Sequence, residues 1–180
     1  MEYIPMTEYE NSPEDIKAEY DDQIAKHGRI TNMKRTLLQD KLSFKVYMEW
    51  YTLYDELISY GLTDRELTVF SYAISTGNDC LICGTFFKKI IVDKGEDPAN
   101  LILSDSEKLL VDFGTQITNN PHNISQEIYD KLREKYDDKT LTALIAFAGI
   151  MYATNLFNTV AKVPLDDVLY SYINDRNEVK

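Results

Sequence analysis

The sequence contains few of the residues that build turns. Seven glycines and five prolines among 180 residues are about half of the usual combined share. A β-sandwich or barrel joins many short strands through turns that need these residues, so their scarcity favours helices. No dipeptide typical of a tight hairpin lies between alternating apolar residues. The composition therefore predicts an all-α chain.

Basic residues and long apolar runs are also scarce. The chain has 19 lysines and arginines against 30 aspartates and glutamates, a net charge of −11. Nucleic acids and anionic membrane surfaces attract basic patches, so neither is expected as a partner. No segment reaches the roughly 18 consecutive apolar residues that indicate a membrane-spanning helix. Residues 1–25 lack a basic start followed by an apolar stretch, so no signal peptide is expected and a cytoplasmic location is the default.

Capping signals and apolar spacing divide the chain into helices. Thr63 with Glu66, and Ser104 with Glu107, have the spacing of capping boxes that open a helix. The expected helices cover residues 16–27, 33–41, 44–61, 64–76, 80–92, 105–118, 125–136, 139–160 and 164–173. This pattern predicts a single-domain, multi-helix bundle. We expect residues 1–27 to form an N-terminal arm and first helix, residues 28–173 the helical domain, and residues 174–180 a polar tail.

The helix expected near residues 141–160 is apolar on nearly every side. Leu144, Ala148 and Met151 belong to one stripe, while Phe147 and Ile150 lie on another face. A helix of this kind is buried all round. Its second face is either ordinary core or an interface with another subunit, and the sequence favours neither.

Two cysteines are present, three residues apart, as Cys80 and Cys83. On a helix this spacing places both thiols on one face, within reach of a reversible disulfide. A helix N-terminus stabilises a thiolate, whereas the neighbouring Asp79 opposes it. Three interpretations remain open: a redox pair, two incidental buried cysteines, and a metal site. Zinc needs four ligands, and neither a second CxxC nor an HxxxH is present, so the metal site is the weakest of the three and no metal or cofactor is expected.

Two motifs in this region resemble a known family. Thr63–Leu67 followed by Asn78–Cys83 is similar to the core of the alkylhydroperoxidase (AhpD)-like branch of the carboxymuconolactone decarboxylase family. Asn155 and Asn158 lie in a downstream segment that resembles the closing helix of that family. The resemblance spans roughly residues 28–167.

The resemblance implies an all-α fold that oligomerises through helices into trimers or hexamers. It also implies peroxide reduction in which Cys83 attacks the peroxide and Cys80 resolves the product as a disulfide. A dithiol or lipoyl-type protein would then return the pair to its reduced state. The helix-terminus argument by itself favours Cys80 as the more acidic thiol, so the two lines of reasoning assign the roles differently.

Two positions depart from the family pattern. The family histidine, one turn beyond the second cysteine, is replaced by Phe87, which cannot carry a proton. The family glutamate falls on Thr68, and the nearest acid, Glu66, has a structural explanation as a capping residue. Glu66 is nevertheless kept as the third candidate catalytic residue. These departures motivate an alternative hypothesis, a degenerate relative that senses redox state or binds a partner without efficient turnover.

Overall fold

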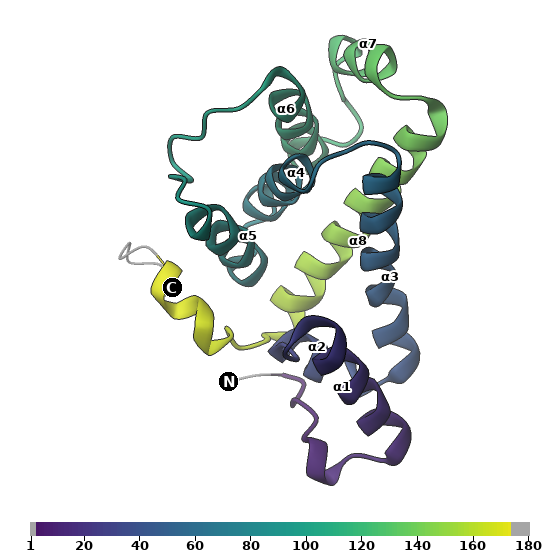
Figure 1. The fold of residues 1–180 in the computed structure, drawn as a ribbon, viewed down its shortest axis with the longest axis vertical. Helices are drawn as coiled ribbons and strands as arrows, with labels where there is room; N and C mark the ends of the chain where they lie inside the picture. The colour runs from purple at the N-terminus through teal and green to yellow at the C-terminus, as the bar shows by residue number, and fades with distance from the viewer. Residues whose placement is uncertain (1–2, 174–180) are drawn as a thin grey trace.

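The computed structural model describes residues 3–173, and all of their regular structure is helical (Figure 1). In chain order the elements are η1 (Tyr9–Asn11), α1 (Glu14–His27), α2 (Asn32–Leu37), α3 (Lys41–Ser59), α4 (Asp64–Gly77), α5 (Leu81–Asp93), α6 (Asp105–Asn119), α7 (Gln126–Lys135), α8 (Asp138–Ala161) and η2 (Asp167–Tyr172). The two η elements are short 3₁₀ helices. The all-α prediction is therefore confirmed.

The capping signals set most helix boundaries as expected. Both capping boxes form, at the starts of α4 and α6. The helix expected over residues 33–41 is wrong at its end, because Asp40 accepts a hydrogen bond from the Ser43 amide and so begins α3 at Lys41. The last expected helix, residues 164–173, is shorter and is the 3₁₀ helix η2.

Helix α4 lies at the centre of the main core and packs against α5, α6 and α8. Helix α3 runs alongside α8 (Figure 1). Phe70 of α4 stacks on Phe113 of α6, with ring centroids 5.9 Å apart, and on Phe147 of α8. Gly114 permits this close approach, because a Cβ there would lie 3.1 Å from the Phe70 ring.

A second, smaller core joins the N-terminal helices to α3. Ile16 and Tyr20 of α1 pack with Leu37, Leu38 and Phe44. This cluster fixes α1 and α2 at the end of α3 (Figure 1). It thereby holds α2 over one end of the main bundle, where the candidate site lies.

The N-terminal arm folds back onto its own chain. The Tyr3 amide donates to the Ala161 carbonyl at 3.1 Å, and the Thr7 amide donates to the Arg35 carbonyl at 3.1 Å. The Tyr20 hydroxyl donates to the Thr7 carbonyl. These contacts tie the arm to α1, α2 and the end of α8. The polar tail expected over residues 174–180 lies outside the described residues.

Helix α8 has one buried face and one open face. Leu144, Phe147 and Met151 belong to the core. The opposite side carries what we call the α8 stripe, formed by exposed apolar side chains: Ile145, Tyr152, Leu156 and Val160. Within residues 3–173, α8 is the one helix long and apolar enough to cross a membrane by length and composition. Its inward face packs against α3, α4, α5 and α7 as a core helix does.

Candidate active site

The connection between α4 and α5 positions the first cysteine. Asp79 adopts the left-handed backbone conformation, with φ of 52°, and reverses the chain direction. The Cys80 amide then donates to the Ser75 carbonyl at 3.0 Å. Cys80 becomes the N-cap of α5 rather than a residue of its first turn. Cys80 therefore lies at the N-terminus of α5, where the partial positive charge of the helix favours a thiolate.

These surroundings acidify Cys80. Hydrogen bonding with the Cys83 thiol is the strongest influence on the Cys80 sulfur, and the nearby backbone amides of Cys83 and Ile82 add to it. Together these influences outweigh burial and lower the pKa of Cys80 to about 7. The direction agrees with the helix-terminus argument made from the sequence.

Cys83 holds the proton of the pair. Its side chain is 6% exposed, and the Asn158 Nδ2 donates to Cys83 Sγ at 3.2 Å. The hydrogen bond to Cys80, followed by burial, raises the pKa of Cys83 well above its usual value. Both cysteines are free thiols in this structure. Once the pair has lost one proton, with a pKa of about 7, Cys80 is the thiolate and the remaining proton lies on Cys83.

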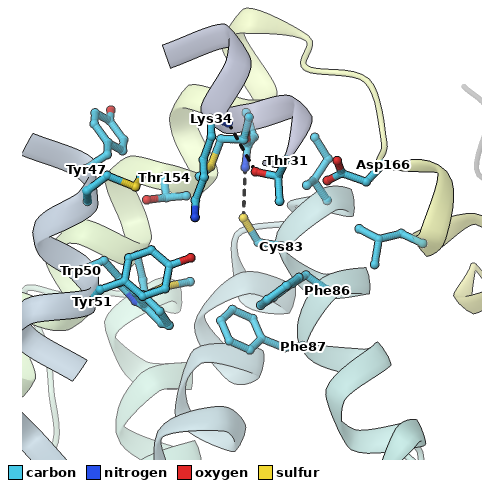
Figure 2. A pocket seen from close by; sticks show the side chains of 16 residues that line it. Thr31, Lys34, Tyr47, Trp50, Tyr51, Cys83, Phe86, Phe87, Thr154 and Asp166 are labelled. Carbon is cyan, nitrogen blue, oxygen red and sulfur yellow. Dashed lines mark hydrogen bonds between the residues drawn. The ribbon is translucent and has the colours of Figure 1, made fainter. Parts of the chain in front are cut away.

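Cys83 faces a cavity of about 90 Å³ between α2, α3, α5, α8 and the segment that leads into η2 (Figure 2). Its walls are largely aromatic and include Trp50, Tyr51, Phe86 and Phe87. The volume holds several atoms the size of a water oxygen, enough for a small molecule. A substrate in this space would lie against the Cys83 sulfur.

Residues with polar side chains also line this cavity. Lys34, from α2, is 2% exposed and lines it, as Figure 2 shows. Burial lowers the pKa of Lys34 to about 8. Trp50 Nε1 and Asn158 Oδ1 also belong to cavity residues, and each is buried without a hydrogen-bond partner among the described residues. Buried polar atoms are normally paired, so these two atoms are unusual.

Sequence reasoning missed Lys34 entirely. It is one of 19 basic residues and lies in a short polar helix, so no local pattern distinguishes it. Only the packing of α2 over the cavity singles it out.

The opposite face of α5 carries a second, open depression. Cys80 lines it together with Asp79, Lys88 and Tyr172. Residues 82, 83, 86 and 87 line the first cavity, whereas residues 80, 81, 84, 85 and 88 line this one. The two buried cysteines thus border hollows on different sides of one helix.

No protein-family model and no curated protein sequence matches this chain. Solved structures do match it over nearly their whole length. The AhpD-core, peroxidase-related protein from Ralstonia eutropha JMP134 is 19% identical, with a TM-score of 0.75 and 94% of each chain covered. A peroxidase-related protein from Silicibacter sp. TM1040 is 14% identical, with a TM-score of 0.75 and 93% of this chain and 92% of that chain covered.

The chain has an AhpD-like fold. The fold that the cysteine motifs imply is therefore confirmed. The same fold is also found in the debrominase Bmp8. A cysteine-to-alanine variant of that protein, in complex with 2,3,4-tribromopyrrole, is 12% identical, with a TM-score of 0.73 and 94% of each chain covered. The AhpD-like fold thus supports more than one chemistry.

In this AhpD-like chain, Glu66 does not meet the cysteines. It lies in the first turn of α4, about 16 Å along the helix axis from the end that leads to Cys80. Its carboxylate accepts hydrogen bonds from Thr63, Ser106 and Lys135. Burial opposes ionisation, but these bonds hold the pKa of Glu66 below its usual value. Glu66 is thus an ionised capping residue that ties α4 to α6 and α7.

The position of the expected histidine is part of the aromatic wall. Phe87 is buried and contacts Trp50, with ring centroids 6.4 Å apart. Thr68, at the position of the family glutamate, donates its hydroxyl to the Asp64 carbonyl of its own helix. Neither side chain moves a proton to or from the cavity. Any proton donor must come from another element.

Proposed function

We propose that this protein is a thiol-dependent peroxidase that reduces a small organic hydroperoxide with Cys83 and Cys80. The observation that carries the proposal is the asymmetry of the pair. Cys83 faces the aromatic cavity, whereas Cys80 accepts the Cys83 hydrogen bond and lines the open depression across α5. This asymmetry supports a role for Cys83 with the substrate and a role for Cys80 in reactivation.

The first step transfers oxygen to Cys83. Its sulfur attacks the terminal oxygen of the hydroperoxide, so that an S–O bond forms and the O–O bond breaks. The thiol proton passes to the Cys80 thiolate, which already accepts a hydrogen bond from it. The alkoxide leaves and takes up a proton. Cys83 becomes a sulfenic acid and the peroxide becomes an alcohol. The two role assignments are thereby reconciled, because Cys80 acts as the base that activates Cys83.

The second step forms the disulfide. The Cys80 sulfur attacks the sulfenic sulfur of Cys83, the S–O bond breaks, and the departing hydroxide takes the Cys80 proton to give water. A dithiol, such as a lipoyl group on a partner protein, then reduces the disulfide by attacking Cys80 from the open depression. This exchange returns both thiols and oxidises the dithiol.

The cavity favours a small and mostly apolar substrate. Its volume of about 90 Å³ and its aromatic walls exclude a bulky lipid chain and favour a compact organic group. The net charge of −11 disfavours the approach of anionic molecules at long range. Cumene hydroperoxide, tert-butyl hydroperoxide and hydrogen peroxide form a series that tests this selectivity.

The test follows the thiols of the reduced protein after one equivalent of peroxide. We expect the parent to lose both thiols and regain them with a dithiol. Cys83→Ser should lose this reaction, whereas Cys80→Ser should still form a sulfenic acid on Cys83, more slowly, which dimedone traps. A sulfenic acid trapped on Cys80 in the Cys83→Ser variant would reverse the assigned roles. Oxidation without catalytic turnover would instead support the redox-responsive alternative.

Reductive dehalogenation is the second candidate, because the aromatic cavity adjoins Cys83 and Bmp8, a debrominase, shares the fold. Two thiols and one carbon–bromine bond would give a disulfide, a carbon–hydrogen bond and hydrogen bromide. Incubation of the reduced protein with 2,3,4-tribromopyrrole tests it. Bromide release matched by loss of two thiols, and abolished in Cys83→Ser, would favour this chemistry over peroxide reduction.

A further inference from the structure

Lys34 is placed across the cavity from Cys83. Figure 2 shows its side chain extending from α2 into the space that the Cys83 sulfur faces. Its Nζ donates to the Gln23 Oε1 at 2.6 Å and lies 4.6 Å from the centre of the Tyr51 ring. Gln23 takes one of the three donors that an ammonium group carries. The remaining donors are available to a molecule in the cavity.

A buried lysine of this kind is unusual. Lysine is almost never fully buried unless it is paired with a carboxylate. None of the described residues forms a salt bridge with Lys34, and the partners that it has are a neutral amide and an aromatic face. Keeping an ammonium there opposes folding, because burial disfavours its charge. Such a group next to a nucleophile in a cavity is a candidate for a chemical role.

We propose that Lys34 is the acid that protonates the leaving oxygen of the hydroperoxide. The proposal rests on the proposed peroxidase function and extends it. Displacement at the terminal oxygen sends the alkoxide away from the attacking sulfur, toward the side of the cavity where Lys34 lies. The ammonium gives its proton to the alkoxide and becomes a neutral amine. It thus performs the proton transfer that Phe87 cannot perform.

The protons balance with Lys34 in this role. The resting pair holds one proton, the ammonium supplies a second, and the hydroperoxide brings a third. The alcohol takes one of these and the water formed in the second step takes two. The products are an alcohol, water and a disulfide, and Lys34 regains its proton from solvent before the next cycle.

The inference predicts a bell-shaped pH profile for the first step. The rate rises as Cys80 becomes the base, near pH 7, and falls as Lys34 loses its proton, near pH 8. The other charged or titratable groups around Lys34 are Asp22, His27, Arg29, Tyr51 and Asp166. Burial lowers the pKa of His27 below 6.5 and raises the pKa of Tyr51 to about 12, so neither titrates between pH 7.5 and 9.

The experiment measures single-turnover rates of the reduced full chain with tert-butyl hydroperoxide from pH 6 to pH 10. Trp50, the one tryptophan, lines the cavity and reports the oxidation by its fluorescence. We expect Lys34→Met to react about 10²-fold more slowly at pH 7 and to lose the alkaline fall. Lys34→Arg, which stays charged, should restore part of the rate and move the fall beyond the measured range. The exposed Lys45→Met serves as the matched control and should keep the parent profile.

Each outcome decides a separate point. A parent whose thiols survive peroxide overturns the proposed function and this inference together. A parent that reacts, with Lys34→Met showing the same alkaline fall, overturns only the role of Lys34. Circular dichroism checks that the variants fold. If Lys34→Met does not fold, the pH profile of Lys34→Arg still tests the inference. A rate that falls near pH 8 in that variant, as in the parent, would contradict the role of Lys34.

Discussion

Cys80 and Cys83 lie in different surroundings although they are three residues apart. The amides at the start of α5 and the Cys83 thiol stabilise charge on Cys80, while the cavity opens onto Cys83. Burial of Cys83 beside the largely aromatic wall makes a thiolate costly there. Keeping the charge on Cys80 and the proton on Cys83 avoids that cost until a substrate is present.

Removing the Cys83 thiol should make Cys80 less acidic. The hydrogen bond from Cys83 is the largest contribution that lowers the pKa of Cys80 to about 7. In Cys83→Ala we expect that pKa to rise, so that less than half of Cys80 is thiolate at pH 7. Thiolate absorbance or the iodoacetamide reaction rate, followed against pH, measures the change. Asn158→Ala should shift the midpoint less, and an equal shift would contradict the dominant role of Cys83.

Lys34 should also make the free energy of unfolding depend on pH. Its pKa is about 8 in the folded chain and about 10.4 when unfolded. Between these values the unfolded chain binds more protons, so the contribution of Lys34 to the free energy of unfolding rises with pH. Urea unfolding of the parent and Lys34→Met should therefore give a stability difference that shifts in favour of the parent from pH 8 to pH 10. A difference that is constant with pH would contradict the buried ammonium.

At the scale of elements, the site depends on how α4 ends and α5 begins. Asp79 takes the left-handed conformation that places Cys80 at the N-cap. Asparagine tolerates this conformation, whereas a β-branched residue does not. The sequence Gly77-Asn78-Asp79 indicates that a helix stops here, but it does not show which residue adopts the positive φ.

Asp79→Val should destabilise the chain by about 1–2 kcal/mol. It should also slow alkylation of Cys80, because Cys80 would no longer hold the N-cap position beside the amides at the start of α5. Asp79→Asn is the matched control and should keep both stability and reactivity. Equilibrium urea unfolding and iodoacetamide kinetics measure the two effects. If Val and Asn behaved alike, the left-handed turn would have no part in positioning Cys80.

At the scale of the whole molecule, the α8 stripe is an apolar surface that stays exposed in a single copy of the chain. Leu156 is 59% and Val160 is 61% exposed, on the same face as Ile145 and Tyr152. A contiguous apolar surface on a helix is typical of an interface between proteins. We propose that a second copy of this chain covers it, which is how the expected trimer or hexamer would form.

Leu156→Asp should disrupt this assembly. Light scattering at micromolar concentration should show at least a trimer for the parent and a smaller species for the variant, because a charge would be buried at the interface. Ile102→Asp is the matched control, since Ile102 is also exposed and apolar but lies in the loop before α6. A monomeric parent would contradict the proposed assembly.

The sequence by itself determined the helices and the cysteine pair. Capping boxes at Thr63 and Ser104, and the CxxC spacing of Cys80 and Cys83, are local signals whose physics acts within a few residues. The sequence also identified Phe87 as unable to relay a proton. These features need no knowledge of distant parts of the chain.

The tertiary structure decided that Cys83 faces the cavity and that Lys34 lies across it. That cavity is bounded by elements far apart in sequence, from α2 to the segment before η2. The burial of Lys34, the capping role of Glu66 and the open face of α8 all depend on the same packing. Burial and desolvation are properties of the assembled core, so the pKa of Lys34 and the division of roles between the cysteines follow only once the helices are packed.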